Sequence, residues 1–278
     1  IGVSESSLKR WADGGRLQVT RTMGGHRRIA LLEAVRFVRE SHLPIVKPEL
    51  LGIDSLSGSP RKATPSNAAE LLSGFLERGE STEARSLLVD LYLEGKSVAW
   101  LCDGPLRYAM QQIGEKWHDD PSGIYQEHRA LDISVQALSY LRVLLAGPRL
   151  EDDADPKPVA IGGAPEGDPY VLGSLASSCV AAESGYQDIN LGAHLPLDSL
   201  VKAAREHNAR LAWLSCSSPA VVPSPKQIDA LGQELETFGA RLVVGGQASP
   251  RGGGRSDNVR VCDSMAEFGA FVSGLISA

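Results

Sequence analysis

Residues 156–278 alternate short apolar runs with amphipathic helical segments, and this alternation constrains the fold more than any other feature. Each helix can return the chain to the start of the next strand, so the pattern predicts a parallel, doubly wound sheet with helices on both faces. Ligands of such sheets bind beyond the carboxyl ends of the strands. The predicted strands are Val159–Gly162, Asp188–Leu191, Leu211–Ser215, Leu242–Gly245 and Val259–Val261. The predicted helices are Val171–Ser184, Leu197–Glu206, Lys226–Phe238 and Met265–Leu275.

A different periodicity precedes this domain. In residues 68–149 apolar positions recur every three to four residues and the connecting segments are short, which predicts an antiparallel four-helix bundle. Residues 51–67 contain Gly, Ser and Pro without apolar periodicity, and they predict a linker in front of the bundle. The predicted bundle helices are Ala68–Arg78, Glu83–Glu94, Val98–Trp117 and Tyr125–Leu145.

Residues 1–50 have the pattern of a small DNA-binding head. Ser4 is a good N-cap for a first helix, and Leu8 and Trp11 follow at helical spacing. Two β-prone runs then flank the turn Gly24–Gly25 and predict a hairpin wing. A recognition helix followed by such a hairpin is typical of a winged helix-turn-helix.

The formal net charge of -6 conceals an asymmetry between the head and the rest of the chain. Residues 1–50 contain nine Lys and Arg against five Asp and Glu, so a basic head precedes an acidic body. A basic head indicates a polyanionic partner, here double-stranded DNA. The predicted DNA contacts are Lys9 and Arg10 in the helix and Arg21, His26, Arg27 and Arg28 in the wing.

Other signals narrow the class of protein. There is no apolar run long enough to span a bilayer and no secretory signal, so we expect a cytoplasmic protein without a membrane partner. The four cysteines lie far apart and predict buried free thiols. Neither a phosphate-binding lysine motif nor a hydrolase constellation accompanies the glycine-rich turns, so no enzyme activity is expected. The sequence opens at Ile1 inside a motif, and we expect further residues before it.

The head carries a specific resemblance. It contains Ser-Leu-Lys-Arg-Trp at residues 7–11, Gly-Gly-Arg-Leu at 14–17 and Arg-Thr-Met-Gly-Gly-His-Arg-Arg-Ile at 21–29, followed by a predicted helix Leu31–Glu40. These segments resemble the winged helix-turn-helix of MerR-type transcription regulators. The resemblance implies that the helix and the wing both contact DNA.

A second signal lies between the last two predicted bundle helices. Trp117 ends one helix, and Glu127 and His128 stand in the first turn of the next. A flat indole can cover apolar surface, while a carboxylate and an imidazole supply polar contacts or a metal ligand. The alternative is an ordinary core Trp beside a solvated Glu-His pair.

The whole chain resembles the CarH/LitR-type regulators, which are light-responsive repressors that use adenosylcobalamin. In that family a Trp, nine residues and then Glu-His stand in the bundle above the corrin, and Trp117, Glu127 and His128 have this spacing. The resemblance implies that Trp117 covers the upper axial group. It also implies that His128 can ligate cobalt after photolysis of the cobalt–carbon bond.

The α/β part of that family carries the motifs Asp-x-His-x-x-Gly, Ser-x-Leu and Gly-Gly. Here the first motif is followed after 41 residues by the second and after 27 more by the third. The resemblance therefore implies a flavodoxin-like (Rossmann-like) cobalamin-binding-type domain. The matching cofactor-binding positions are Asp168, Tyr170, Gly173, Ser215, Ser217, Gly245 and Gly246.

Two of these positions depart from the family pattern. Tyr170 replaces the cobalt-ligating His, and Ser217 replaces the Leu. An imidazole is a good ligand for cobalt, whereas a phenol is a poor one at neutral pH. Three possibilities stay open: cobalamin held without a protein lower ligand, another tetrapyrrole such as haem or a biliverdin-type bilin, or a degenerate domain used only for assembly. His194 is a substitute ligand candidate that we expect to lie away from the point where the strand order reverses.

Together these features predict a DNA-binding transcriptional regulator, a repressor by resemblance, that senses light or a ligand. Its bundle and α/β domain would bind adenosylcobalamin or a related tetrapyrrole. The bound state would control assembly into a dimer or tetramer and hence operator binding. The alternatives are a ligand-independent regulator and a corrinoid carrier for methyl transfer.

Overall fold

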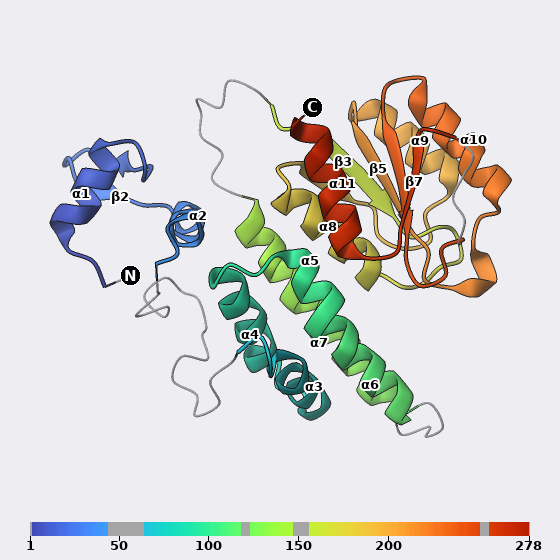
Figure 1. Cartoon of the computed structure of the whole chain (residues 1–278), viewed down its shortest axis with the longest axis horizontal. Coiled ribbons are helices and arrows are strands. Elements are labelled where there is room, and N and C mark those ends of the chain that lie inside the picture. Colours follow the sequence, from blue (N-terminus) through green and yellow to red (C-terminus); the bar gives the residue numbers. More distant parts are fainter. Residues whose placement is uncertain (1, 44–63, 118–122, 147–155, 251–255, 278) are drawn as a thin grey trace. The chain divides into compact units, whose positions relative to one another are not determined.

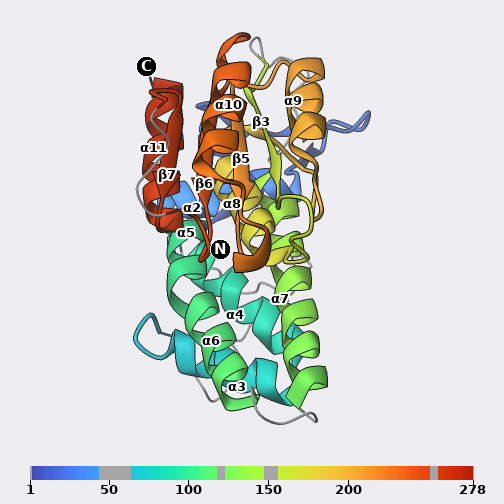
Figure 2. The ribbon, with the colours of Figure 1, turned by 90° about the vertical axis from the view of Figure 1, so that its right-hand side faces the viewer.

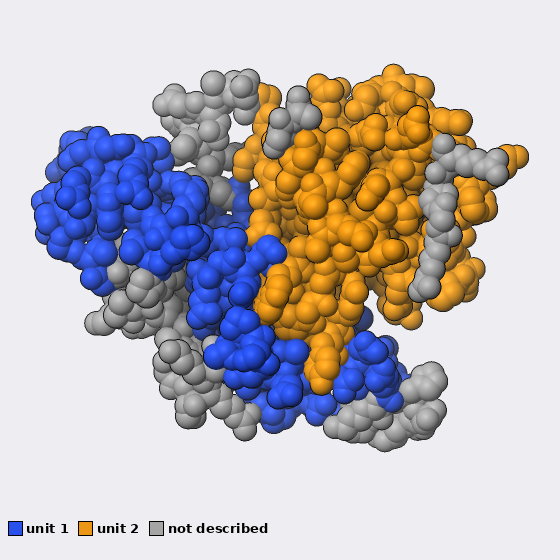
Figure 3. Space-filling model, viewed as in Figure 1, with its two compact units in different colours: residues 1–97, 109–154 blue, residues 98–108, 155–278 orange. Residues whose placement is uncertain are grey.

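The computed structural model describes residues 2–43, 64–117, 123–146, 156–250 and 256–277. It divides into two compact units (Figure 3): Ile1–Ser97 with Ala109–Ala154, and Val98–Tyr108 with Asp155–Ala278. Most of the predicted linker, residues 51–67, lies outside the described residues. None of the helices in the described ranges combines the length and the apolar character needed to cross a membrane.

The head contains two helices joined by a short antiparallel hairpin (Figure 1). Ser4 caps the first helix, because its Oγ accepts a hydrogen bond from the backbone N–H of Ser7. The rings of Trp11 and Phe37 pack together with their centroids 5.1 Å apart, and this contact connects the two helices. The elements of the head are α1 (Glu5–Asp13), β1 (Thr20–Arg21), β2 (Arg27–Arg28) and α2 (Leu31–Ser41).

An ion pair between a buried carboxylate and a partly exposed guanidinium ties α2 to the segment that leads into the hairpin. The carboxylate of Glu33 is buried and accepts two hydrogen bonds from the guanidinium of Arg36. Glu33 also accepts from the backbone N–H of Gln18 at 2.7 Å, and Arg36 donates to the carbonyl of Arg16 at 3.2 Å. This hydrogen bonding raises the pKa of Arg36, so its guanidinium stays charged.

A helical bundle follows (Figure 2), made of α3 (Ala68–Arg78), α4 (Ser81–Leu93), α6 (Arg107–Trp117) and α7 (Gly123–Leu145). The predicted bundle helices end within two residues of these bounds, except at the start of the third. Their apolar positions are buried as the periodicity requires, for example Leu87, Leu138 and Leu141.

The third predicted helix, Val98–Trp117, is not a regular α-helix throughout. It contains α5 (Val98–Leu101), a π-helical turn η2 (Cys102–Leu106) and then α6. Pro105 has no backbone N–H and cannot complete the regular ladder, which accounts for the widened turn.

The segment of α5 and η2 belongs to the α/β unit. The carboxylate of Asp103 accepts hydrogen bonds from the backbone N–H groups of Met265 at 3.0 Å and Ala266 at 2.8 Å. Glu183 accepts from the backbone N–H of Val98 at 2.8 Å. Each carboxylate accepts hydrogen bonds from backbone N–H groups at the start of a helix. These bonds attach the α5–η2 segment to α8 and α11, which cover one face of the sheet.

The predicted parallel sheet is confirmed. Its strand order is β4-β3-β5-β6-β7, all parallel, and the order reverses between β3 and β5. Figure 1 shows α8 and α11 on one face of the sheet and α9 and α10 on the other. The strands are β3 (Val159–Gly163), β4 (Gln187–Asn190), β5 (Leu211–Ser215), β6 (Arg241–Gly245) and β7 (Val259–Cys262). The helices are α8 (Leu172–Glu183), α9 (Leu197–Glu206), α10 (Pro225–Glu236) and α11 (Met265–Ser277), with a short turn η3 (Pro219–Val221).

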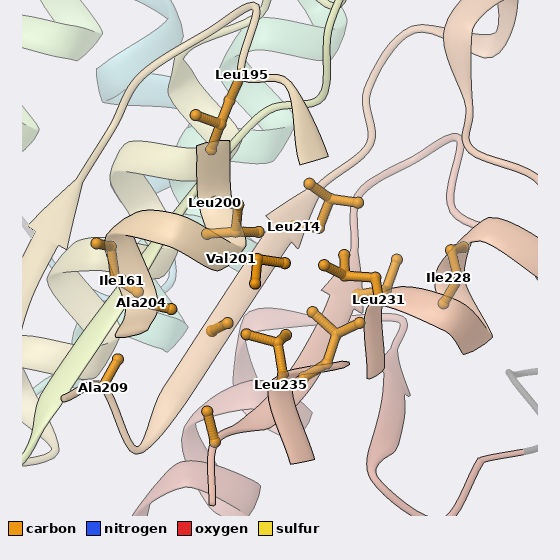
Figure 4. Packing of buried hydrophobic residues seen from close by; sticks show 14 of the residues in the cluster. Ile161, Leu195, Leu200, Val201, Ala204, Ala209, Leu214, Ile228, Leu231 and Leu235 are labelled. Carbon is orange, nitrogen blue, oxygen red and sulfur yellow. The ribbon is translucent and has the colours of Figure 1, made fainter. Parts of the chain in front are cut away.

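The two faces of the sheet are packed differently. Under α9 and α10 the core is aliphatic, with Leu200 and Leu231 packed near Leu214 (Figure 4). On the other face the largest fully buried side chain is that of Trp213, which is 1% exposed. It lies over Gly162, where an added Cβ would come within 2.2 Å of the Trp213 carbonyl oxygen and 2.4 Å of its indole. The indole therefore depends on a glycine in the neighbouring strand.

We predict that Gly162→Ala destabilises the chain by about 1–3 kcal/mol, because the methyl group overlaps backbone and indole atoms that cannot move apart cheaply. Urea unfolding measures the change. The matched control is Gly114→Ala in α6, where nothing lies within 4 Å of the added Cβ, and a gain of roughly 0.5–1 kcal/mol is expected from helix propensity. Equal effects of the two substitutions would contradict the close packing of Trp213 on Gly162.

Candidate functional site

The candidate site lies at the carboxyl ends of β3, β5 and β6. The strand order reverses between β3 and β5, and the loops that leave these two strands diverge to opposite faces of the sheet, which is where such sheets bind ligands. The structure brings all seven predicted α/β positions to this edge. Asp168 and Tyr170 lie in the loop after β3 and Gly173 in α8, Ser215 and Ser217 lie at the end of β5, and Gly245 and Gly246 lie at the end of β6.

Asp168 joins the two loops at the point of reversal. Its Oδ2 accepts hydrogen bonds from the backbone N–H groups of Ser217 at 2.7 Å and Ser218 at 2.9 Å. Its Oδ1 accepts from the backbone N–H of Tyr170 at 3.0 Å. The side chain is fully buried, so these three charge-assisted bonds compensate the loss of its hydration. Asp168 therefore sets the shape of the edge, and its oxygens are used inside the protein.

Two glycines bring the backbones at this edge close together. A Cβ at Gly173 would lie 2.5 Å from the hydroxyl oxygen of Ser215. Gly246 has a φ of +104°, and a Cβ there would lie 2.2 Å from the carbonyl oxygen of Cys216. The Cys216 amide in turn donates to the carbonyl of Gly245 at 2.7 Å. Larger residues at either glycine would push the loops apart.

The polar groups that face this edge suit hydrogen bonding more than metal ligation. The hydroxyl of Ser215 is buried and has no hydrogen-bond partner within the described part of the chain. Burial, together with the nearby carboxylate of Asp168, raises the pKa of the Cys216 thiol to about 12, so it stays protonated. Across the described ranges, no group of three or more His, Cys, Asp or Glu side chains could hold a metal ion.

Tyr170 and His194 are the two residues at this edge that the sequence analysis considered as ligands to the metal of a cofactor. Tyr170 is 46% exposed, and its backbone is held by Asp168. His194 does not lie away from the reversal as we expected. Its backbone N–H donates to the carbonyl of Asp168 at 3.2 Å, and its φ of 55° turns the loop after β4 back toward this edge. Its side chain is exposed.

The remaining predicted cofactor residues lie in the bundle. Trp117 is the last residue of α6, and its side chain lies outside the described part of the structure. Glu127 and His128 are in the first turns of α7, and both side chains are exposed. Neither makes a hydrogen bond or an ion pair with another described residue. Their roles as cofactor contacts, and that of His128 as a cobalt ligand, stay predictions.

The predicted DNA-contact residues divide into two kinds. Arg10, Arg21, Arg28 and His26 are exposed, and no described residue pairs with their side chains. Lys9 forms an exposed ion pair with Glu5 at 2.9 Å, which competes weakly with another partner.

Arg27 differs from the other cations of the wing. Its guanidinium donates to Asp13 Oδ1 at 2.5 Å and to the carbonyl of Lys9 at 3.2 Å. These bonds tie β2 to the end of α1. Arg27 therefore holds the wing against the helix, whichever ligand the head binds.

A buried chain of polar groups was missed by the sequence analysis. The indole Nε1 of Trp213 donates to Ser174 at 3.1 Å, and Ser174 donates to Asn190 Oδ1 at 2.7 Å. One turn further along α8, Ser178 donates to the carboxylate of Asp188. Two serines four apart on a buried helix, facing two polar residues two apart in a strand, are a signal that could have indicated this network.

Comparison with known families identifies one part of the chain. Residues 69–142 match the protein-family model described as B12 binding domain. The bundle is therefore a B12-binding (cap) domain. The resemblance of the head to MerR-type regulators, and of the whole chain to CarH/LitR-type regulators, stays a prediction.

Comparison with solved structures shows a corrinoid-protein fold over 76% of this chain. The monomethylamine corrinoid protein of Methanosarcina barkeri is 16% identical, with a TM-score of 0.55 over 76% of this chain and 100% of that chain. The methanol:cobalamin methyltransferase complex MtaBC from Methanosarcina barkeri is 14% identical, with a TM-score of 0.40 over 100% of this chain and 94% of that chain. A cobalamin-binding protein from Desulfitobacterium hafniense DCB-2 is 17% identical, with a TM-score of 0.37 over 76% of this chain and 97% of that chain.

Two features of this edge bear on whether a corrinoid could bind here. Gly173 and Gly246 let the loops at this edge approach closely, and the unpaired hydroxyl of Ser215 is buried beneath them. Tyr170 does not fit as a ligand to the metal, because a neutral phenol is a poor donor.

We predict that Asp168→Asn destabilises the chain by about 1–3 kcal/mol, because an amide nitrogen cannot accept hydrogen bonds and buried N–H groups lose their partner. Urea unfolding measures the loss, and faster hydrogen exchange at the amides of Ser217 and Ser218 locates it. The control is Asp257→Asn, an exposed carboxylate near β7. Unchanged exchange at both serines would show that Asp168 does not hold the two loops together.

Proposed function

We propose that this chain is a DNA-binding transcriptional regulator that senses a corrinoid. Residues 69–142 supply a B12-binding domain, and the α/β unit supplies the fold of a corrinoid protein. In this function adenosylcobalamin is the cofactor, and its state controls DNA binding by the basic head.

The arrangement of the head is the observation that best supports a DNA-binding regulator. A short helix and a two-stranded hairpin are locked together by Arg27, which bonds to Asp13 and to the carbonyl of Lys9. This leaves Arg10 and Arg28 exposed and unpaired among the described residues. Cations held on a rigid helix and hairpin, without acidic partners, are what contact with a phosphate backbone requires. The resemblance to MerR-type heads supports the same function.

Adenosylcobalamin, when bound, supplies a light-labile bond between cobalt and carbon. By resemblance to CarH/LitR-type regulators, Trp117 covers the upper axial group, and Glu127 and His128 supply polar contacts on the same side. Both side chains of the pair are exposed and therefore accessible to a ligand. A change in what Trp117 and His128 contact would favour one packing of the bundle over another. That choice would set assembly into a dimer or tetramer, and pairing of heads raises affinity for DNA.

A second function, a corrinoid carrier for methyl transfer, is favoured by one specific observation. The monomethylamine corrinoid protein is matched along its entire length, so about three quarters of this chain (76%) share the fold of a corrinoid protein named for a methylated amine. The basic head and the substitution at Tyr170 speak for the regulator. Haem or a biliverdin-type bilin, and a domain used only for assembly, are outcomes that the first experiment below distinguishes.

We predict that the purified chain retains adenosylcobalamin after incubation in the dark and desalting. Green light should then change its visible spectrum and shift its mass in size exclusion. Trp117→Ala and His128→Ala should each alter the photoproduct, whereas His207→Ala, an exposed imidazole at the end of α9, should not. Haem or bilin absorption bands would show that a different tetrapyrrole is the cofactor. The absence of any retained pigment would contradict the proposed sensing function.

We predict that the chain binds a mixed-sequence DNA duplex at low salt and that Arg28→Ala weakens this binding. Loss of one phosphate contact should lower the slope of log affinity against log salt by about 1. Lys202→Ala, which removes an exposed cation of the α/β unit, is the matched control.

Arg27→Ala provides a second comparison. It should weaken DNA binding and also lower the stability of the head by roughly 1 kcal/mol, because it removes two hydrogen bonds of a partly exposed guanidinium. Arg28→Ala should leave stability unchanged. Retention of cobalamin without any DNA binding would refute the regulator and favour the carrier.

A further inference from the structure

One arginine of the head binds the bundle. Arg39 lies in the last turn of α2, and its Nη1 donates hydrogen bonds to the carbonyl oxygens of Tyr92 at 2.6 Å and Lys96 at 3.0 Å. Its guanidinium carbon also lies 3.6 Å from the centroid of the Tyr92 ring. The head and these residues of the bundle belong to the same compact unit. A single side chain of the head therefore makes three contacts with the bundle.

The carbonyl groups that Arg39 binds belong to the end of α4. Gly95 follows this helix with a φ of +98°, and the backbone N–H of Lys96 donates to the carbonyl of Leu91 at 3.0 Å. This turn is common after the last residue of a helix, where carbonyl groups lack partners within the helix. A cation is favoured at such an end, because these carbonyl groups carry partial negative charge. The face of the Tyr92 ring adds a cation–π attraction to the same guanidinium.

Docking through Arg39 does not use the cations that we assign to DNA. Arg10 lies in α1 and Arg28 in β2, and both side chains are exposed. Arg39 lies in a different helix, and its side chain is partly buried. A docked head can therefore still contact DNA, and docking changes how freely the head moves.

The segment that receives Arg39 is also tied to the α/β unit. Residues Glu94–Ser97, the α4–α5 loop, lead directly into Val98, the first residue of α5. The backbone N–H of Val98 donates to the carboxylate of Glu183 at 2.8 Å, and both residues belong to the α/β unit. Only Ser97 separates Val98 from Lys96. Successive Cα atoms stay about 3.8 Å apart, so a shift at the start of α5 must displace the carbonyl of Lys96.

We propose that the α4–α5 loop couples the α/β unit to the DNA-binding head, and that Arg39 is the residue of the head through which this coupling acts. While Glu183 holds the start of α5, the carbonyl of Lys96 stays within reach of Arg39 and the head moves with the bundle. A shift at the start of α5 removes this acceptor and favours a released head. The use of this coupling to transmit a ligand signal rests on the proposed function.

The test is ¹⁵N relaxation of the head amides in the full chain, without added cofactor. A docked head reports the slow tumbling of the large unit, and a released head reports a several-fold shorter correlation time. Arg39→Ala should release the head. The matched control is Arg85→Ala, which removes a guanidinium 5.3 Å from the Tyr140 ring inside the bundle. This control should leave tumbling of the head unchanged.

Two further variants test the coupling. Glu183→Ala removes the acceptor at the start of α5. Gly95→Ala strains the loop, because its positive φ disfavours a side chain, whereas the nearest atom to the added Cβ is His42 Nδ1 at 3.9 Å. Each should shorten the correlation time of the head toward the value of Arg39→Ala. Adding Glu183→Ala to Arg39→Ala should cause no further change, because both act on the same contact.

Two controls perturb the α/β unit away from the α4–α5 loop. Ser178→Ala removes a hydrogen bond to Asp188 elsewhere in α8. Gly192→Ala places a side chain at a φ of +79° after β4, where nothing lies within 4 Å of the added Cβ. Neither substitution touches the loop or Arg39, so tumbling of the head should not change.

Each contrary outcome overturns a defined part of the proposal. Independent tumbling of the head in the wild-type chain, or a docked head in Arg39→Ala, overturns the contact assigned to Arg39. Unchanged tumbling in Glu183→Ala or Gly95→Ala, or an equal change in the controls, overturns coupling through the loop. If Glu183→Ala does not fold, Gly95→Ala decides the coupling. Because no cofactor or DNA is present, a failure to bind either would refute the proposed function without changing this result.

Discussion

The carboxylate of Asp168 is the interaction on which the candidate site depends. Parallel sheets leave the loops of neighbouring strands free to diverge where the strand order reverses. Asp168 opposes this divergence, because its two oxygens bind the loop after β5 and the start of its own loop together. The loop after β4 joins them through the N–H of His194. One residue thus links three loops: the carboxylate of Asp168 joins two of them, and its backbone carbonyl holds the third.

The two faces of the sheet differ in how they are packed. The face under α9 and α10 is an aliphatic core with ordinary packing. The face under α8 holds Trp213, Ser174 and Asn190 in a polar chain that no isolated helix or strand would form. Buried polar networks of this kind fix one arrangement of a core, because an unpaired member is costly. The α8 face beside the candidate site is therefore closely packed and its buried polar groups are paired.

Carboxylates at helix starts tie the α5–η2 segment to the rest of the α/β unit. Asp103 caps α11 and Glu183 caps α5, so the beginning of the long third helix is anchored before its π-helical turn. The head uses the same device on a smaller scale, where buried Glu33 binds Arg36 and the backbone of Gln18. In both places the charge is stabilised by several donors at once.

The sequence by itself determined the order and type of nearly all helices and strands, because apolar period and glycine position depend only on neighbouring residues. It also placed the seven α/β site residues at one edge, since the carboxyl ends of parallel strands must meet. It did not reveal the widened turn at Pro105, the capture of Arg27 by Asp13 or the position of His194 beside Asp168. Those features arise from contacts between residues far apart in the chain, or from backbone conformations such as the positive φ of His194. Tertiary structure alone also decided that Trp213 packs under α8 against Gly162, because an indole in a strand can face either side of a sheet until its neighbours are in place.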